Sequence, residues 1–408
     1  MKIAIVSQYF YPENFVINQV SFMLRDLGHE VSVFTSHPNY PSGSLFDGYE
    51  SNSIFHDELD GIHIFRAKAY PRGSGGFFNL FLNYFAFILF GLLTFPKVFK
   101  QTSPDIILFF GTSPLTSIIP AIYLKLRFGK PLVPWVLDLC PQSLYATGYI
   151  TNKYLLKILE FIPKIAFSFS DHILAQSVSY RNYLAKYKNI EDITYFPSVV
   201  DPNSFISDDD QLSADFYSQF DNYFTVVFTG NIGSLQDFDV LLRSADALQH
   251  LPIKFILVGS GSYVSSLENC IISQAITNVV LYPQLPLNQM SSIYALSDCL
   301  FVSLKRDDPN YPYLSLTTPG KVQAYMSTGK PIVACLEGEG AATIMAANCG
   351  LVSPCGDHHL LTNNLLTIFS MSQVERDTLG YNGLSYFKKN FEINSQVRKL
   401  SSVFETLL

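Results

Sequence analysis

Short apolar runs alternate with stretches of helical periodicity along almost the whole chain. This alternation is typical of parallel β-sheets that carry helices on both faces, because their strands are buried throughout. The first half contains the runs KIAIVSQ, VSVFTS, IHIFRA, IILFFGT, LVPWVLDL and HILAQS. The second half contains FTVVFTG, KFILVGSG, NVVLYPQL, CLFVSL, PIVACL and GLVSP. The sequence therefore predicts two doubly wound α/β domains.

Chain length and one stretch of distinct composition indicate the domain boundary. A chain of 408 residues exceeds the usual size of one hydrophobic core. Residues 197–223 are acidic, rich in serine and contain prolines, which is typical of a linker with a surface segment. We expect a first domain over 1–198 and a second that begins at 199. Two such domains facing each other would form a cleft at the carboxyl ends of their strands.

The composition excludes several classes of function. The net charge is −7 and no basic run with interleaved aromatic residues occurs, so we expect no nucleic-acid partner. The six cysteines lack CxxC spacing, which argues against a zinc site or a disulfide framework, and we interpret all six as small core residues. The start, MKIAIVSQYF, lacks the features of a signal peptide, so we expect a cytoplasmic protein.

Three loops of the second domain follow predicted strands and carry ligand-binding features. The first, within TGNIGSLQDFDVLL, contains Gly230, Asn231, Gly233 and Gln236. The second, VGSGS, contains Gly259 and Gly261, and the third, LYPQLPLNQM, contains Leu285. Each glycine turn alone could be an ordinary strand-to-helix connection. Their convergence at one sheet edge favours a nucleotide site, because glycines let backbone amides approach a phosphate.

Other nucleotide and metal motifs are missing from the sequence. The first strand is followed by SQYFYPENF in place of GxGxxG, which disfavours a nicotinamide or flavin enzyme. Neither GxxxxGK[ST] nor HExxH occurs. P-loop and zinc-hydrolase functions are therefore excluded.

Together these segments carry a family resemblance. SQYFYPE and LRDLGHEVSVFTS at the start, GNIGSLQDFD, VGSGS and GKVQAYMSTGKPIVA occur in the order seen in glycosyltransferase family 4. The chain resembles that family, and within it the bacterial branch of O-antigen, colanic acid and capsule assembly that includes L-fucosamine (FucNAc) transferases. The resemblance implies two Rossmann-like domains of the GT-B fold, with a nucleotide-sugar site in 199–381, an acceptor site in 1–198, and a final helix over 382–408 that returns to the first domain. It also implies that no metal is required.

The chain departs from the family at two places. Family members commonly carry an Arg and a Lys for the donor diphosphate where this chain has Asn231 and Gln236. Positive charge must then come from elsewhere, and the candidates are Lys305, Arg306 and Lys321. Lys305 and Arg306 could equally be a solvated pair on a loop. We favour Lys321, because Gly320 and Lys321 lie where a loop becomes a helix N-terminus and the helix dipole acts on the same anion.

The second departure is the loss of two family glutamates, whose places are Leu316 and Ala324. Gln323 beside the second place could bind ribose hydroxyls or an acetamido group. Thr317 and Thr318 could contact the sugar. Neutral groups fit a deoxy, N-acetylated sugar better than a fully hydroxylated hexose.

Two carboxylates of the first domain are candidates for binding the acceptor or accepting its proton. Asp138, in VLDLCPQSLYATG, follows a strand and could accept a proton from an acceptor hydroxyl or brace its loop. Glu13, in YPEN after the first strand, is the second candidate. Family membership implies retention of configuration, whereas an inverting reaction would require a base such as Asp138.

A third segment, residues 77–95, has 19 residues without a charge and eight aromatic side chains. It is long enough to span a bilayer, but a span would separate strands of one sheet. It is therefore either a core helix or an interfacial helix whose aromatic face, with Phe81, Phe85 and Leu89, dips into the membrane. Basic residues flank it, namely Arg66, Lys68, Arg72, Lys97 and Lys100. We favour the interfacial helix.

The leading hypothesis is a peripheral membrane glycosyltransferase on the inner face of the bacterial cytoplasmic membrane. It would transfer a sugar from a UDP-sugar, for example UDP-L-FucNAc, to a lipid-linked acceptor such as GlcNAc-diphosphate-undecaprenol. One alternative is an enzyme of the UDP-sugar 2-epimerase type. The other is a non-catalytic nucleotide-sugar-binding protein at the membrane.

Overall fold

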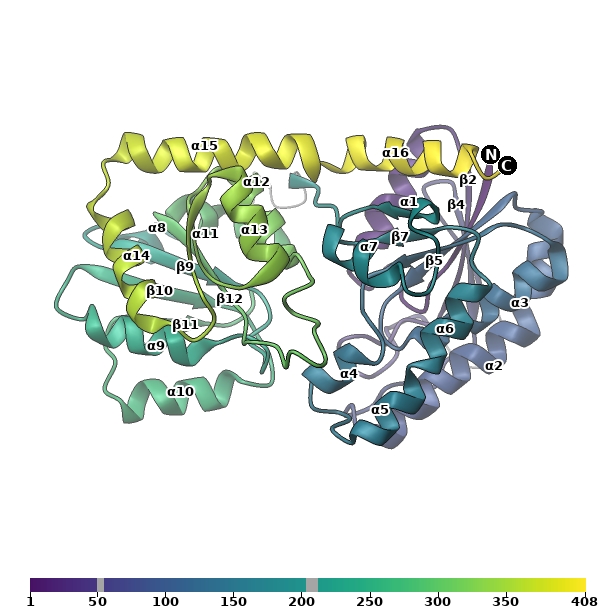
Figure 1. Cartoon of the computed structure of the whole chain (residues 1–408), viewed down its shortest axis with the longest axis horizontal. Coiled ribbons are helices and arrows are strands. Elements are labelled where there is room, and N and C mark those ends of the chain that lie inside the picture. Colours follow the sequence, from purple (N-terminus) through teal and green to yellow (C-terminus); the bar gives the residue numbers. More distant parts are fainter. Residues whose placement is uncertain (50–54, 203–211) are drawn as a thin grey trace. The chain divides into compact units, whose positions relative to one another are not determined.

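The computed structural model describes residues 1–49, 55–202 and 212–408, and the chain divides into two compact units. One unit comprises Met1–Ser198 and Ile393–Leu408, and the other comprises Val199–Glu392. Both are doubly wound α/β domains, so the predicted fold class is confirmed (Figure 1). All twelve predicted apolar runs contain a strand.

The N-terminal domain contains an eight-stranded sheet in the order β3-β4-β2-β1-β5-β6-β7-β8. Its strands are β1 (Lys2–Val6), β2 (Glu30–Ser36), β3 (Phe55–Leu59), β4 (Ile62–Ala67), β5 (Ile106–Gly111), β6 (Leu132–Val136), β7 (Ile173–Ala175) and β8 (Ile193–Tyr195). The pairing is parallel except between β3 and β4. Strands β3 and β8 were not predicted. Asp60 and Gly61, with φ of 50° and 80°, form the two-residue turn that joins β3 to β4.

Helices cover this sheet and fix its connections (Figure 1). They are α1 (Val16–Asp26), α2 (Phe77–Thr102), α3 (Ile119–Phe128), α4 (Gln142–Ala146), α5 (Lys153–Leu159), α6 (Phe161–Ser168) and α7 (Val178–Leu184). Helix α2 packs on β2, β4 and α3, and its buried Phe95 and Phe99 contact Phe34 of β2. The segment that could span a membrane is therefore an integral layer of this domain.

The C-terminal domain contains a six-stranded parallel sheet in the order β11-β10-β9-β12-β13-β14. Its strands are β9 (Phe224–Thr229), β10 (Ile253–Val258), β11 (Val279–Tyr282), β12 (Cys299–Ser303), β13 (Ile332–Cys335) and β14 (Gly350–Ser353). Side chains alternate between two core clusters, with Val227 in one and Phe228 in the other. Both faces of the sheet are therefore buried, which explains the continuous apolar runs.

Two groups of helices cover those faces (Figure 1). Helices α9 (Phe238–Ala247), α10 (Val264–Ser273) and α14 (His358–Ser370) contribute to one cluster. Helices α11 (Met290–Leu296), α12 (Gly320–Ser327), α13 (Gly338–Ala347) and α15 (Gln373–Asn390) contribute to the other.

The expected single helix over 382–408 is wrong, because two helices cover this region. Helix α15 begins at Gln373 and packs on α12 and α13, whereas α16 (Ile393–Glu405) packs on α1 of the N-terminal domain. The break lies at Phe391, whose φ of −130° ends α15 and whose side chain is buried with Phe387 in the C-terminal core. The return of the last helix to the first domain agrees with the prediction, and His29 Nε2 lies 2.8 Å from Ser401 Oγ.

Two smaller expectations also need correction. Part of the predicted linker belongs to the second domain, because Phe220 is buried in its core and Phe216 of α8 (Ala214–Ser218) packs on Tyr282. The middle of that linker, 203–211, lies outside the described residues. Of the six cysteines, Cys140 and Cys270 are only partly buried, whereas the other four are core residues as expected.

Candidate active site

The two glycine turns of the C-terminal domain pack directly against each other. Gly230 follows β9 with φ of 110°, and a Cβ atom on Gly259 would lie 1.9 Å from the Gly230 carbonyl oxygen. The Ile232 amide donates to the Ser260 carbonyl at 2.8 Å. Because β9 and β10 are neighbouring parallel strands, both turns lie at their carboxyl edge. Only glycine allows the two backbones to approach this closely.

The third predicted loop joins the same edge. Ser260 Oγ donates to Gln284 Oε1 at 2.6 Å, which connects the turn after β10 to the loop after β11. Leu285 in that loop is partly buried and packs on the core. The three loops therefore meet as the sequence predicted, while their role in ligand binding stays a prediction.

The polar side chains of the first turn mainly stabilise the turn itself. Gln236 Oε1 accepts a hydrogen bond from the Gly233 amide at 3.0 Å. The Asn231 side chain fills the space beside Gly233 and Gly261, since a Cβ atom on either glycine would lie within 2.7 Å of it. These two residues shape the loop and bring no positive charge to it.

Lys321 supplies positive charge at this turn. A Cβ atom on Gly230 would lie 3.5 Å from the Lys321 Nζ atom, which also lies 4.9 Å from the centre of the Phe228 ring. Burial lowers the pKa of Lys321 to about 8. In the described part of the chain, no carboxylate forms an ion pair and no acceptor forms a hydrogen bond with this ammonium group. Lys321 is therefore a desolvated cation that is available to an anion.

Helix α12 holds Lys321 in place through a tyrosine. Tyr325, one turn along the helix, is fully buried, and its hydroxyl accepts a hydrogen bond from the Thr229 amide at 2.9 Å. Thr229 immediately precedes Gly230, so this bond fixes the helix to the first glycine turn. The pKa of Tyr325 is raised by burial, so the hydroxyl stays protonated.

The loop before α12 depends on a residue that the sequence analysis missed. Asp307 accepts hydrogen bonds from the amides of Tyr313, Leu314 and Ser315 at 2.9, 2.9 and 2.7 Å. Gly338 closes the same loop, since a Cβ atom there would lie 1.9 Å from the Ser315 carbonyl oxygen. The DDPN sequence after β12 is a turn signal that could have identified this aspartate.

The other candidate residues in α12 and just before it differ in accessibility. Gly320 is exposed, and a Cβ atom there would meet open space. Thr318 is almost fully buried and Thr317 is partly exposed. Gln323 has no exposed surface, and neither its Nε2 nor its Oε1 atom has a hydrogen-bond partner. Its predicted contact with the donor would need this part of the helix to open.

The two other candidate cations differ in availability. Arg306 donates to Glu337 Oε1 at 3.1 and 2.7 Å and to the Cys355 carbonyl at 3.2 Å. Lys305 is exposed, and its Nζ atom lies 5.9 Å from the centre of the Tyr263 ring. Arg306 is thus occupied by the protein, whereas Lys305 can reach a ligand.

In the N-terminal domain, Glu13 braces two loops at the sheet edge. Its Oε1 atom accepts hydrogen bonds from the Asn39 and Tyr40 amides at 2.9 and 2.8 Å, and its Oε2 atom accepts one from the Phe10 amide at 3.2 Å. The side chain is almost fully buried, and burial raises its pKa to about 7. This geometry favours a positioning role, and contact with the acceptor stays a prediction.

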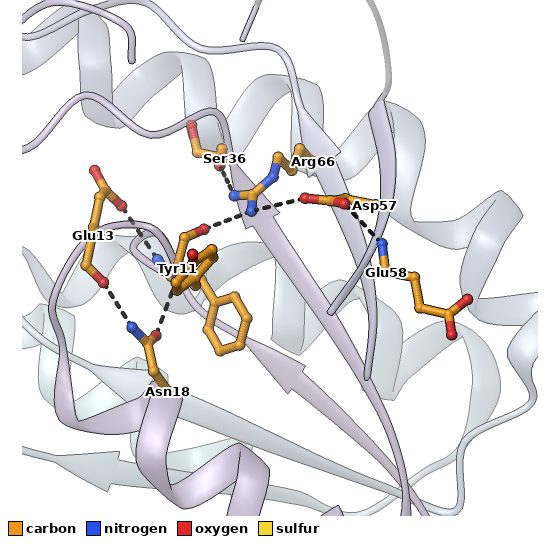
Figure 2. A network of polar contacts seen from close by, with 8 residues as sticks. Tyr11, Glu13, Asn18, Ser36, Asp57, Glu58 and Arg66 are labelled. Atoms are coloured by element: carbon orange, nitrogen blue, oxygen red, sulfur yellow. Dashed lines mark hydrogen bonds and ion pairs between the residues drawn. The ribbon is translucent and has the colours of Figure 1, made fainter. Parts of the chain in front are cut away.

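Arg66 was predicted to be one of the basic residues beside α2 at the membrane, but it does not lie on the surface. It is fully buried, donates to the Tyr11 carbonyl at 2.6 Å and forms an ion pair with Asp57 at 3.7 Å (Figure 2). A buried guanidinium needs such partners. Arg66 is therefore part of the domain interior.

Asp138 follows β6 and is partly exposed. Its Oδ2 atom accepts a hydrogen bond from the Ser113 amide at 2.9 Å, which connects the loops after β5 and β6. The carboxylate therefore braces a loop and is still partly exposed. Both predicted roles, bracing the loop and accepting a proton from the acceptor, are compatible with this position.

Helix α2 exposes an apolar face. Phe81, Phe85 and Leu89 are 55%, 49% and 39% exposed, and the helix is long and apolar enough to cross a membrane. Helices α5 and α6, which the sequence analysis overlooked, expose apolar side chains as well: Tyr154, Leu155, Ile158, Phe161 and Ile165. Helices α2 and α6 pack against the same 3-10 turn, Leu115–Ile118. In the sequence of α5 and α6, apolar residues four positions apart with lysines between them could have indicated this exposed apolar face.

Among the described residues, no cluster of three or more His, Cys, Asp or Glu side chains could hold a metal ion.

Comparison with known proteins agrees with the observed fold. Residues 223–371 match the model of the family Glycosyl transferases group 1. The full chain superposes on sucrose-phosphate synthase from Thermosynechococcus elongatus with a TM-score of 0.76 at 16% identity, covering 100% of this chain and 98% of that one. A trehalose-6-phosphate structure from E. coli, bound with UDP-2-fluoro glucose, gives 0.74 at 14% identity with both chains fully covered. Anabaena HepE in complex with UDP gives 0.69 at 14%, again with both chains fully covered.

The fold and the family match define the class: this chain is a glycosyltransferase of the GT-B fold. Within that class it is similar to WcaI of Escherichia coli (strain K12), which is named for colanic acid biosynthesis. The two are 22% identical over 295 residues, which cover 68% of this chain and 70% of WcaI.

Proposed function

We propose that this glycosyltransferase transfers a sugar from a UDP-sugar to a lipid-linked saccharide during synthesis of a bacterial surface polysaccharide. The observation that carries the proposal is the unpaired Lys321 ammonium at the two packed glycine turns. A desolvated cation beside exposed backbone and a helix N-terminus suits a diphosphate. Two structural neighbours, one in complex with UDP and one bound with UDP-2-fluoro glucose, support a uridine nucleotide as the carrier of this diphosphate.

The proposed reaction assigns different tasks to the two domains. The bond between the anomeric carbon and the diphosphate oxygen breaks, and Lys321 stabilises the negative charge that develops on that oxygen. The acceptor hydroxyl oxygen forms the new bond and loses its proton. In an inverting reaction, Asp138 would accept that proton. We propose that no metal is required, because Lys321 supplies the positive charge.

The nature of the acceptor is inferred from the apolar surface and from the relative. The exposed faces of α2, α5 and α6 would dip into the inner leaflet, with Lys153, Lys157 and Lys164 near anionic headgroups. A polyprenyl-diphosphate-linked GlcNAc would be presented at that surface. The resemblance to FucNAc transferases and the lost glutamates favour N-acetyl-L-fucosamine as the sugar. The family match does not favour the epimerase alternative.

Transfer is tested with a panel of UDP-sugars, with and without a short-chain polyprenyl-diphosphate-GlcNAc acceptor, in EDTA. We expect radiolabelled sugar on the lipid, with UDP-L-FucNAc as the best donor. Isomerisation without acceptor would overturn the proposal in favour of an epimerase. Binding of UDP-sugar without turnover would favour a non-catalytic protein.

Membrane association is tested by replacing Phe81, Phe85 and Leu89 with serine. We expect the variant to lose co-sedimentation with phosphatidylethanolamine–phosphatidylglycerol vesicles while it keeps its melting temperature. The matched control replaces Ile272, Met345 and Val374, which are exposed apolar residues of the C-terminal domain, with serine. Equal vesicle binding by both triple variants and the unmodified protein would contradict the proposed surface.

A further inference from the structure

The N-terminal domain contains a second unpaired cation, Arg72, at the carboxyl edge of its sheet. Three adjacent parallel strands, β4, β2 and β1, lead into its surroundings. Pro71 and Arg72 follow β4, Asn39 and Tyr40 follow β2, and Tyr9 follows β1. The Arg72 amide donates to Asn39 Oδ1 at 3.3 Å, which fixes the backbone of this residue at the edge. Ligands of open α/β sheets bind at such edges.

Aromatic rings hold the guanidinium of Arg72. Its Cζ atom lies 5.1 Å from the centre of the Tyr40 ring and 5.9 Å from that of Tyr9. Its Nη1 atom donates to the Tyr9 hydroxyl at 3.0 Å. The Phe15 ring stacks on the Tyr9 ring with 4.9 Å between their centres and so supports the ring that contacts Arg72. These contacts orient the planar group before any ligand arrives.

No carboxylate neutralises Arg72 within the ranges 1–49, 55–202 and 212–408. Arg66, six residues earlier, has the opposite character, because it is buried and paired with Asp57. Arg72 is only partly buried, and its Nε and Nη2 atoms have no hydrogen-bond partner among the same residues. An oriented guanidinium with free donors fits a phosphate or diphosphate, which it can bind through two hydrogen bonds.

The apolar helix begins next to this cation. A Cβ atom on Gly73 would lie 2.6 Å from Asn79 Nδ2 of α2, and Asn83 of α2 donates to Asn39 Oδ1 at 3.2 Å. The first turns of α2 expose Phe77, Phe78 and Phe81. Tyr40 and Tyr11 are exposed beside the edge, at 40% and 42%. The start of the apolar helix and the aromatic rings of Tyr9 and Tyr40 therefore both lie near this cation.

We infer that Arg72 binds the diphosphate of a polyprenyl-diphosphate-linked acceptor. Such a molecule has an isoprenoid, an anionic diphosphate and a sugar, and the apolar helix, the cation and the aromatic rings near it match these three parts chemically. This inference rests on the proposed function for the presence of a lipid-linked acceptor. It assigns to the N-terminal domain a diphosphate site of its own, separate from the donor site at Lys321.

The test measures binding of farnesyl diphosphate to the full-length protein by calorimetry, without any donor. We expect Arg72→Gln to weaken binding by about 10- to 100-fold, which corresponds to the loss of charge-assisted hydrogen bonds. Farnesol, which lacks the diphosphate, should bind the variant and the unmodified protein equally. Arg72→Lys should retain part of the affinity.

Arg127→Gln is the matched control. Arg127 also donates to a tyrosine hydroxyl, that of Tyr123 at 2.8 Å, and lies over two aromatic rings, but it is at the end of α3, which leads into the amino end of β6. We expect its farnesyl diphosphate binding to equal that of the unmodified protein. Equal binding by Arg72→Gln, or an equal loss in Arg127→Gln, would overturn the inference.

Two further measurements separate the possible failures. Co-sedimentation with phosphatidylglycerol vesicles should be unchanged in Arg72→Gln. If this variant instead leaves the vesicles while farnesyl diphosphate binding is unaffected, Arg72 binds lipid headgroups and the inference is wrong. If the unmodified protein transfers no sugar to any lipid-linked acceptor, the proposed function fails, whereas farnesyl diphosphate binding that depends on Arg72 still establishes the site.

Discussion

Glu13 at the carboxyl edge of the N-terminal sheet and Lys321 at that of the C-terminal sheet differ in the partners that the fold gives them. In the N-terminal domain, both oxygens of the buried Glu13 carboxylate accept backbone hydrogen bonds. In the C-terminal domain, the Lys321 ammonium has no ion pair and the Gln323 amide has no hydrogen bond, as far as the described residues extend. A satisfied buried group stabilises the loops around it, whereas an unsatisfied one costs stability until a ligand arrives. Glu13 is therefore a structural residue, whereas we expect Lys321 and Gln323 to contact a ligand.

The largest expected effect follows from removal of the unsatisfied cation. Lys321→Met should lower kcat/KM for the donor by about 100- to 1,000-fold, as loss of a group that stabilises transition-state charge does. Stability at pH 7 should stay the same or rise, because a desolvated charge is removed. Steady-state kinetics and thermal unfolding measure the two quantities.

The pH profile of the same site provides an independent check. Burial lowers the pKa of Lys321 to about 8, so the free enzyme loses this charge above that pH. We expect kcat/KM to fall above pH 8 in the unmodified enzyme, because kcat/KM reports the ionisation of the free enzyme. Lys321→Arg keeps its charge and should lack this fall. Identical profiles for both proteins would show that Lys321 does not bind the donor as a cation.

The second largest effect concerns the satisfied carboxylate. Glu13→Ala leaves three amides without their acceptor and should lower the free energy of unfolding by about 2–3 kcal/mol. Burial raises the pKa of Glu13 from its usual 4.5 to about 7, so the folded state binds more protons than the unfolded state between these values. The contribution of Glu13 to stability therefore falls as the pH rises from about 4.5 to 7. Denaturant titrations should show this slope in the unmodified protein and lose it in Glu13→Gln.

A smaller effect of opposite sign is expected at Gln323. Replacing a buried amide without partners by methionine removes its desolvation cost and should stabilise the protein by about 1 kcal/mol. Its donor KM should rise if the amide contacts the ligand after α12 opens. A loss of stability would show that the Gln323 amide has a hydrogen-bond partner in the folded protein. Gln323 would then no longer count as an unsatisfied buried group.

The smallest effect is expected at Arg306. Its ion pair with Glu337 is exposed, and water and salt screen such pairs so that they add little to stability. Arg306→Ala should therefore change neither stability nor donor KM by a measurable amount. Lys305→Ala is the neighbouring control. Lys305 forms no ion pair with any described residue, so its replacement should raise the donor KM. A larger effect at Arg306 than at Lys305 would reverse their assignment.

The sequence predicted the strands and the meeting of the glycine turns, because burial on both faces produces continuous apolar runs and because parallel strands end at one edge. It could not distinguish Glu13 from Lys321, since both are single charged residues in loops or at helix starts. Their difference lies in the partners that the fold supplies, such as the amides of Asn39 and Tyr40 for Glu13. Arg66 shows the same limit, because only the fold places Asp57 beside it. Asp307 and the turn at Asp60 and Gly61, in contrast, carried local signals that could have been used.

The central claim is that Lys321 binds the diphosphate of a UDP-sugar. Titration calorimetry of UDP at pH 8.5 in EDTA, in two buffers of different ionisation enthalpy, tests it directly. An anion that pairs with Lys321 raises the pKa of that ammonium, so binding should take up a fraction of a proton, and Lys321→Met should bind UDP about 10- to 100-fold more weakly without uptake. Equal affinity and equal proton uptake in the two proteins would contradict the claim.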